Sequence, residues 1–197
     1  MSHDYAVLAR HERFQGPLFD VVSDEVAMPG GGRATRDYMR HVGAVAVVAL
    51  DEDGRVVLVR QYRHPVGRTL WELPAGIIDD ADEALVDAAA RELAEETDLT
   101  AGRWDLLIDL HTSPGCSSEL IRVFLARQLT PVPADRRHAR RHEEAELTVT
   151  MMDLERAADL VLAGDITNAT CSAGLLAAAR ARADEFRKLR SVSTPLP

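Results

Sequence analysis

Short runs rich in β-branched and other apolar residues recur along the chain, separated by turns that contain glycine, proline or acidic residues. Runs of this length, bounded by such turns, are typical of β-strands. Two pairs of runs flank the turns at 29–32 and 51–54, and we predict that each pair forms a hairpin. The predicted strands cover residues 18–28, 33–41, 43–50, 55–62, 104–111, 120–129 and 147–152.

Helical spacing appears in the last quarter of the chain. Asp153 begins a helical segment that runs to residue 163, and its carboxylate is suited to accept hydrogen bonds from the amides of the first turn. A second helix, rich in Ala and Leu, is predicted over 169–189. Residues 190–197 are expected to form a frayed tail.

The segment 76–99 predicts an acidic helix with two faces. At about 100° per residue, Glu92, Glu95 and Glu96 fall on one stripe. Like charges four residues apart destabilise a helix by ~0.2–0.5 kcal/mol per pair, so a bound cation would relieve this stripe. A solvated acidic face is the alternative. However, Gly76 precedes the helix in what reads as a loop, where bare backbone can approach a ligand closely. Oxygen ligands of this kind suit a hard divalent ion such as Mg²⁺. The apolar stripe consists of Val86, Ala89 and Leu93.

The length and composition limit the class of protein. A chain of 197 residues with 46% hydrophobic residues can form one sizeable domain with appendages. Neither end carries an apolar run of signal-peptide or membrane length, so we expect a cytoplasmic protein with no membrane partner. Cys116 and Cys171 are too few for a disulfide framework and lack zinc-site spacing, so we expect two free thiols.

The net charge of −9 argues against bulk electrostatic binding of nucleic acid or of an anionic membrane. Any phosphate ligand must therefore be held locally. The glycines at 30–32 do not form a P-loop, because no Gly-Lys-Ser/Thr follows them. The basic run at 136–142 is expected to be a solvated loop, with attraction of a phosphate-bearing substrate as the alternative.

The acidic segment resembles the Nudix box, G-x5-E-x7-R-E-U-x-E-E-x-G-U, where U is apolar. Its core at 91–96, RELAEE, is a specific match. Six residues rather than five separate Gly76 from Glu83, which leaves the role of Glu83 open. Asp98 stands where the box has glycine. Because Asp tolerates the left-handed conformation, we expect Asp98 to hold the turn at the end of the helix.

This resemblance covers roughly residues 43–175 and implies an α/β protein with the Nudix fold, a mixed β-sheet sandwiched between helices. In relatives that cleave ADP-ribose, an N-terminal β-rich extension commonly builds a homodimer. The expected organisation is therefore a dimerisation extension at 1–42, a hydrolase domain at 43–189 and a flexible tail at 190–197.

Members of this family cleave a nucleoside diphosphate linked to another group, so the box implies the reaction but not the substrate. Three other segments resemble ADP-ribose pyrophosphatases of the actinobacterial type: QYRH at 61–64, SPG at 113–115 and GDITN at 164–168. Pro114 carries most weight, because a proline at this distance past the box is associated with ADP-ribose specificity. The resemblance thus implies hydrolysis of ADP-ribose to AMP and ribose 5-phosphate with Mg²⁺ or Mn²⁺.

The resemblance also implies which residues bind the metal. Glu92, Glu96 and the carbonyl of Ala75 are the expected ligands, and Glu95 is a ligand or orients one. Arg91 is expected to form a structural ion pair, with Glu72 as the suggested partner. Gly76 and Pro114 complete the structural residues of the site.

The catalytic base of the ADP-ribose enzymes lies on a loop outside the box. Glu144 is the expected base here and Glu143 is the alternate. The alternative is that this loop is only a disordered acidic patch without a catalytic role. Arg63 is expected to grip the diphosphate, since a planar guanidinium suits phosphate oxygens, although a surface cation is the alternative. The substrate-binding residues are expected to be Arg36, Arg63, Ser113, Gly115 and Glu119.

Three other functions fit parts of the sequence. The nearest is hydrolysis of another nucleoside diphosphate derivative, such as a different ADP-sugar, a dinucleoside polyphosphate or an oxidised nucleotide. A sensor that binds ADP-ribose without cleaving it is disfavoured by the intact RELAEE and the absence of a basic recognition helix after residue 168. A calcium module at 79–83 lacks the EF-hand alternation and its glycine.

Overall fold

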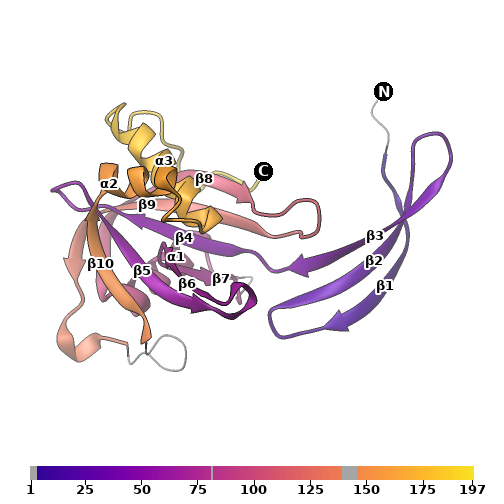
Figure 1. The fold of residues 1–197 in the computed structure, drawn as a ribbon, viewed down its shortest axis with the longest axis horizontal. Coiled ribbons are helices and arrows are strands. Elements are labelled where there is room, and N and C mark those ends of the chain that lie inside the picture. The colour runs from indigo at the N-terminus through magenta and orange to yellow at the C-terminus, as the bar shows by residue number, and fades with distance from the viewer. Residues whose placement is uncertain (1–3, 81, 139–145) are drawn as a thin grey trace. The chain divides into compact units, whose positions relative to one another are not determined.

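The computed structural model describes residues 4–80, 82–138 and 146–197. The chain divides into two compact units, one formed by residues 1–43 and 111–120 and the other by residues 44–110 and 121–197. Figure 1 shows the order of the elements. The strands are β1 (Val7–Gln15), β2 (Phe19–Ala27), β3 (Arg33–His41), β4 (Ala44–Ala49), β5 (Arg55–Arg63), β6 (Arg68–Glu72), β7 (Ala75–Ile77), β8 (Leu99–His111), β9 (Leu120–Pro131) and β10 (Thr148–Asp153). The α-helices are α1 (Leu85–Thr97), α2 (Leu154–Ala163) and α3 (Ala169–Arg182), and two short 3₁₀ helices cover His64–Val66 and Ala134–Arg136.

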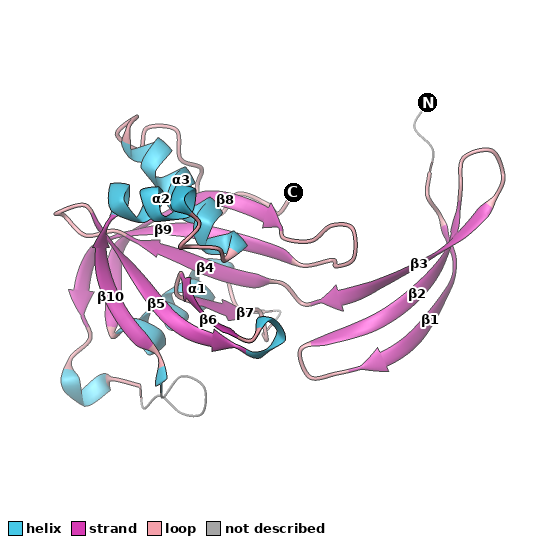
Figure 2. Cartoon of the chain, viewed as in Figure 1, coloured by secondary structure: helices cyan, strands magenta, loops and turns pink. Residues whose placement is uncertain are grey.

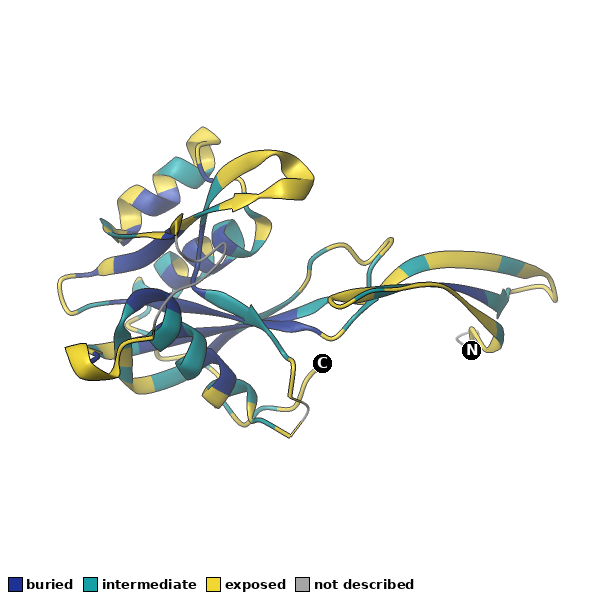
Figure 3. Cartoon of the chain, turned by 90° about the horizontal axis from the view of Figure 1, so that it is seen from below, coloured by how far each residue is buried: buried dark blue, intermediate teal, exposed yellow. Residues whose placement is uncertain are grey.

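The first unit is built on a three-stranded antiparallel sheet in the order β1-β2-β3. The hairpin predicted from the turn at 29–32 is confirmed as β2 and β3, with Phe19 opposite His41. Sequence patterning missed β1. Almost all of its residues are exposed, as the colours of Figure 3 show, so it has no buried face to impose an alternation of apolar and polar residues.

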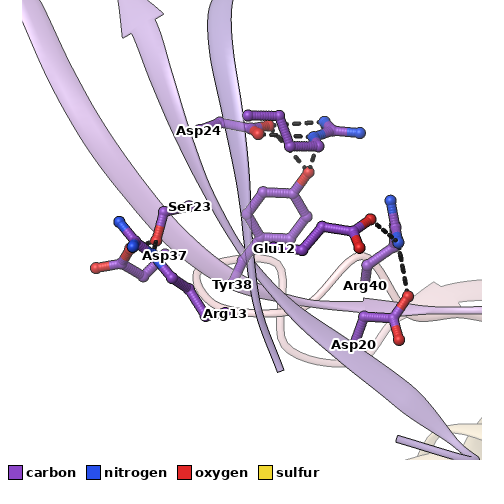
Figure 4. Close-up of polar contacts among 9 residues, drawn as sticks. Glu12, Arg13, Asp20, Ser23, Asp24, Asp37, Tyr38 and Arg40 are labelled. Atoms are coloured by element: carbon purple, nitrogen blue, oxygen red, sulfur yellow. Dashed lines mark hydrogen bonds and ion pairs between the residues drawn. The ribbon is translucent and has the colours of Figure 1, made fainter. Parts of the chain in front are cut away.

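Charged side chains link the three strands of this sheet (Figure 4). Arg10 on β1 donates two hydrogen bonds of 2.7 Å to the carboxylate of Asp24 on β2. Tyr38 on β3 donates to the same carboxylate at 3.1 Å. The hydrogen bond from Arg10 is the main reason that the pKa of Asp24 is lowered. Arg40 on β3 pairs in the same way with Glu12 and Asp20.

The second unit contains two sheets, in the orders β7-β4-β9-β8 and β10-β5-β6 (Figure 2). Strand β4 runs parallel to β9 and antiparallel to β7, so the first sheet is mixed, as predicted. All six residues of β4 are buried. A strand buried on both faces needs packed layers on both sides.

Two buried clusters supply those layers, one on each face of β4. Val45 and Val47 pack in the cluster that contains α1, while Ala46 and Val48 pack in the cluster that contains α2 and α3. The predicted sandwich of a mixed sheet between helices is therefore confirmed. The residues that the helices contribute are Ala88, Ala89 and Leu93 from α1, Leu154 and Ala157 from α2, and Cys171, Leu175 and Ala178 from α3. Within the described residues, every helix is too short or too polar to cross a bilayer.

Two predictions about the strands are wrong. The runs around 51–54 are joined by a tight turn, in which the amide of Asp51 donates to the carbonyl of Arg55 at 2.9 Å. Beyond one antiparallel bridge between Leu50 and Val56 they do not continue as a hairpin, because β4 pairs with β7 and β9 whereas β5 pairs with β6 and β10. Gly76 lies in the short strand β7 rather than in a loop. Local pattern cannot distinguish these cases, since partner strands lie far away in sequence.

The two helices predicted in the last quarter are confirmed, α2 with the predicted bounds and α3 with a shorter length than predicted. The carboxylate of Asp153 accepts a hydrogen bond of 3.0 Å from the amide of Arg156 and caps α2, as expected. Helix α3 ends at Arg182 instead of residue 189. Glu185 and Phe186 adopt positive φ angles of 51° and 58°, a conformation that no α-helix continues.

The C-terminal segment, expected to fray, is hydrogen-bonded to the second unit. Arg190 pairs with Leu106 as an antiparallel bridge. The buried guanidinium of Arg122 donates to the carbonyls of Thr194 at 2.7 Å and Pro195 at 3.0 Å. These contacts hold the end of the chain beside β8 and β9.

Candidate metal and phosphate site

The predicted metal ligands of the second unit come together where α1 crosses β7. Gly76 on β7 lies directly beneath the side chain of Glu92 on α1. A Cβ atom added to Gly76 would lie 2.1 Å from Cδ and 2.2 Å from Oε1 of Glu92. Only glycine leaves room for this carboxylate. The glycine of the sequence motif therefore has a steric reason, which is the close approach of an acidic side chain.

Glu96 lies one helical turn further along α1 and is buried, with 6% of its surface exposed. Its carboxylate accepts a hydrogen bond of 3.0 Å from the amide of Ala75. Burial of a carboxylate is costly unless donors surround it. The hydrogen bond brings the backbone at Ala75 and the carboxylate of Glu96 into direct contact, so two of the expected ligands are neighbours.

Arg91 binds the carboxylates that surround it. Its guanidinium lies 2.6 Å from Glu92, 3.1 Å from Glu83 and 3.7 Å from Glu95. The hydrogen bonds to Glu83 are the largest cause of the raised pKa of Arg91, and burial opposes them. Glu83, whose role the sequence left open, is thus one of the carboxylates that bind Arg91. The suggested pair of Arg91 with Glu72 is wrong.

Glu72 binds Arg63 instead. The Arg63 guanidinium on β5 makes contacts of 2.6–3.2 Å with both carboxylate oxygens of Glu72 on β6. Glu72 is buried, whereas 44% of the Arg63 side chain is exposed. A buried carboxylate in such a bidentate pair fixes the orientation of an exposed guanidinium. Sequence reasoning missed Glu72 as the partner of Arg63, although a charged residue between Trp71 and Leu73 in a strand was a signal.

The other expected substrate contacts belong to the first unit. Arg36 lies on β3 and donates to the carbonyl of Thr35 at 2.9 Å. The loop 113–119 lies beside the same strand, since the amide of Met39 donates to the carbonyl of Cys116 at 2.8 Å and the amide of Ser118 donates to the carbonyl of Met39 at 2.9 Å.

Within that loop, the expected residues hold a turn together. The Ser113 carbonyl accepts from the amides of Cys116 and Ser117 at 3.0 and 2.9 Å, and Pro114 and Gly115 form the turn between them. Glu119 accepts a short hydrogen bond from the hydroxyl of Thr112. Ser113 and Pro114 therefore have a local structural role, whatever ligand the loop contacts.

The donor set of the second unit fits a hard divalent cation. Carboxylate and carbonyl oxygens are the ligands that Mg²⁺ and Mn²⁺ accept. Within the described parts of the chain, no three His, Cys, Asp or Glu side chains already form a group that could hold a metal. The alternative bases Glu143 and Glu144 lie outside the described residues.

A comparison with protein families shows which family the chain belongs to. The model of the NUDIX domain matches residues 39–169, which is more than half of the chain. The chain belongs to the Nudix family. The resemblance seen in the sequence is thereby confirmed, and with it the interpretation of the α1 segment as the Nudix box.

Similar proteins in the Nudix family include two with the same name. The chain is 46% identical over 176 residues to the ADP-ribose pyrophosphatase of Mycobacterium tuberculosis, covering 89% of this chain and 84% of that one. It is 35% identical over 168 residues to the ADP-ribose pyrophosphatase of Bacillus subtilis, covering 85% and 89%.

A solved structure described as an ADP compounds hydrolase superposes with a TM-score of 0.79 and covers 94% of this chain and 97% of its own. At 23% sequence identity, that likeness concerns the fold alone. The Nudix fold expected from the sequence is confirmed by both kinds of comparison.

Proposed function

We propose that this Nudix protein hydrolyses the diphosphate bond of ADP-ribose to give AMP and ribose 5-phosphate. The observation that supports the proposal is the packing of Glu92 against Gly76 beside the Glu96–Ala75 hydrogen bond, which brings two carboxylates next to β7. The two relatives named as ADP-ribose pyrophosphatases support the choice of substrate.

The residues that would hold the cation are Glu92, Glu96 and the carbonyl of Ala75, with Glu95 as a ligand or an orienting group. When bound, Mg²⁺ or Mn²⁺ neutralises phosphate oxygens and lowers the pKa of a coordinated water. Arg91 orients Glu92 through the 2.6 Å contact.

Phosphate recognition and proton transfer belong to other residues. Arg63 would grip the diphosphate, since Glu72 holds its guanidinium with 44% of the side chain still exposed. In the first unit, Arg36, Ser113, Gly115 and Glu119 remain proposed substrate-binding residues. Glu144 remains the proposed base, with Glu143 as the alternate.

Two variants test the function together. Glu92→Gln keeps the size of the side chain but removes its charge, so metal-dependent turnover should be abolished while the thermal unfolding midpoint stays close to that of the wild type. Glu144→Gln should mainly lower kcat. The assay incubates purified protein with ADP-ribose and Mg²⁺ or Mn²⁺ and measures AMP and ribose 5-phosphate. Wild-type rates in both variants would refute the assignment.

A panel of other nucleoside diphosphate derivatives tests the substrate. ADP-glucose, a dinucleoside polyphosphate and an oxidised nucleoside triphosphate should each give a lower kcat/KM than ADP-ribose. A preference for any of them would keep the reaction and replace the substrate. ADP-ribose binding without product would indicate a sensor.

We also propose that the chain forms a homodimer through its N-terminal sheet. Val22 is the only buried apolar residue among the described residues of the first unit, whereas Val7, Leu8, Phe14 and Phe19 are exposed on its sheet. Sedimentation analysis should show a dimer for the wild type and a monomer for Phe14→Glu.

We further propose that the protein is cytoplasmic. Both Cys116 and Cys171 are free thiols, which is the usual state of cysteines in the reducing cytoplasm.

A further inference from the structure

A cavity of about 570 Å³ opens beside α1 in the second unit. Helix α1 contributes Arg91, Ala94 and Glu95 to its wall. The remaining lining comes from the segment that follows β9, namely Val132, Arg136, Arg137 and His138. The cavity thus shares Glu95 and Arg91 with the proposed metal site.

Hydrogen bonds hold the segment after β9 in place. The amide of Val132 donates to the carbonyl of Asp98 at 2.8 Å, which ties the segment to the end of α1. Arg137 donates through Nε to the carbonyl of Val132 at 3.3 Å. Because Nε is one of five N–H donors on a guanidinium, the bond orients Arg137 and leaves its forked end for other acceptors.

The lining is cationic although the protein carries a net charge of −9. The positive charge of Arg91 is taken up by Glu83, Glu92 and Glu95, as their distances of 2.6–3.7 Å show. The two positive charges of Arg136 and Arg137 then exceed the single negative charge of Glu95, and His138 adds a further hydrogen-bond donor. In an acidic protein, a local excess of positive charge around a cavity favours an anionic ligand.

We infer that this cavity binds the phosphomonoester that hydrolysis produces, carried on ribose 5-phosphate or on AMP. The inference rests on the proposed function. Hydrolysis of a diphosphate diester converts each linked phosphate into a phosphomonoester, which carries a charge of ~−1.5 to −2 near pH 7. Paired arginines bind such a dianion more strongly than the less charged phosphates of the substrate. The cavity therefore selects product over substrate.

The size of the cavity agrees with an organic phosphate. Cavities that hold small organic ligands measure ~300–1,000 Å³, and this one falls within that range. Ala94 and Val132 give it an apolar part that a sugar can contact, next to the arginines that would take the phosphate.

Calorimetric titration of metal-free protein in EDTA tests the inference, since no cation is then present to bind phosphate at the carboxylates. The ligands are ribose 5-phosphate, AMP, dimethyl phosphate and unphosphorylated ribose. The proteins are the wild type, Arg136→Ala and Arg156→Ala. Arg156 is an exposed arginine on α2 that does not line the cavity. Arg156→Ala therefore removes the same charge as Arg136→Ala and serves as its control.

The wild type should bind ribose 5-phosphate or AMP more tightly than dimethyl phosphate or ribose, and the tighter of the first two identifies the product that is held. Arg136→Ala should weaken this binding by about tenfold, the effect of losing one charge-assisted hydrogen bond. Arg156→Ala should bind as the wild type does.

Equal binding by wild type and Arg136→Ala, an equal loss in Arg156→Ala, or no preference for phosphomonoesters would overturn the inference. The same preparations are assayed for ADP-ribose cleavage with metal. If the protein cleaves ADP-ribose but its binding of phosphomonoesters does not depend on Arg136, the cavity assignment alone is refuted. Binding that depends on Arg136 without cleavage refutes the proposed function alone.

Discussion

Gly76→Ala gives the sharpest test of how β7 and α1 fit together. The φ angle of Gly76 is not in the left-handed region, so the backbone accepts alanine without strain. The added methyl group would instead lie 2.1–2.6 Å from three atoms of Glu92, far inside the ~3.5–4.0 Å separation of carbon atoms in contact. Glu92 must therefore turn away and give up its 2.6 Å contact with Arg91.

The expected cost follows from that displacement. The clashing atoms belong to the flexible end of Glu92, so the cost is mainly that of the lost contact with Arg91, and we expect urea unfolding of Gly76→Ala to show a loss of ~0.5–1.5 kcal/mol. In the Glu92→Ala background the clashing atoms are absent. There the same substitution should be neutral or stabilising, because replacing glycine with alanine restricts the unfolded chain and contributes ~0.4–1 kcal/mol.

Two measurements accompany the unfolding curves. Calorimetry with Mn²⁺ should show at least a tenfold loss of affinity in Gly76→Ala, equivalent to ~1.4 kcal/mol, and ADP-ribose turnover should fall in parallel. Gly32→Ala is the control, since a Cβ at Gly32 meets nothing within 4 Å. If Gly76→Ala bound Mn²⁺ as tightly as the wild type, or cost the same stability with and without the Glu92 side chain, the steric reasoning would be wrong.

Three further predictions concern the stability of the fold. Arg122→Met removes the 2.7 Å partner of the Asp109 carboxylate and leaves it only the 2.9 Å contact with Arg190, so the free energy of unfolding measured in urea should fall by ~1.5–3 kcal/mol; a loss under ~0.5 kcal/mol would contradict this. The pKa of Asp24 is lowered, first by its hydrogen bond from Arg10, so the ionised Asp24 stabilises the fold above the unfolded pKa of ~3.9, and this stabilisation is lost as the pH falls through the lower folded pKa. Thermal melts between neutral and acidic pH should show that Asp24→Asn lacks this part of the acid dependence. Superimposable pH profiles of variant and wild type would refute the prediction. Gly174→Val should lower the melting temperature strongly, because a Cβ on this face of α3 already lies 2.7 Å from a neighbouring leucine methyl group, whereas an unchanged melting temperature would show that the helix can shift.

The Nudix box was readable because its information is local. The stripe of Glu92, Glu95 and Glu96 follows from helical spacing alone, and so does the burial of Ala89 and Leu93 on a neighbouring stripe about a third of a turn away. Asp98 adopts the left-handed conformation expected at the end of α1, with a φ of 57°. Such features depend on residues within one or two helical turns of each other.

Contacts between segments distant in sequence were not readable in the same way. The acidic residues around the box gave Arg91 several possible partners, and the sequence suggested Glu72. The structure pairs Arg91 with Glu92, its neighbour in sequence on α1, and with Glu83, which precedes the helix, while Arg63 on β5 reaches Glu72 on β6. The register of β5 and β6 puts Val59, not Arg63, opposite Glu72, so neither local pattern nor register alone reveals the Arg63–Glu72 pair.

By itself, the sequence determined the positions of most strands, the acidic helix, the cap at Asp153 and the family, because each depends on short-range periodicity or on a motif of fixed spacing. Only the tertiary structure decided that β4 and β5 enter different sheets, that Gly76 makes room for Glu92, and that Arg136 and Arg137 line a cavity beside α1. The physical reason is that these arrangements join residues far apart along the chain, and the packing of the two cores selects one set of partners among many that local pattern allows.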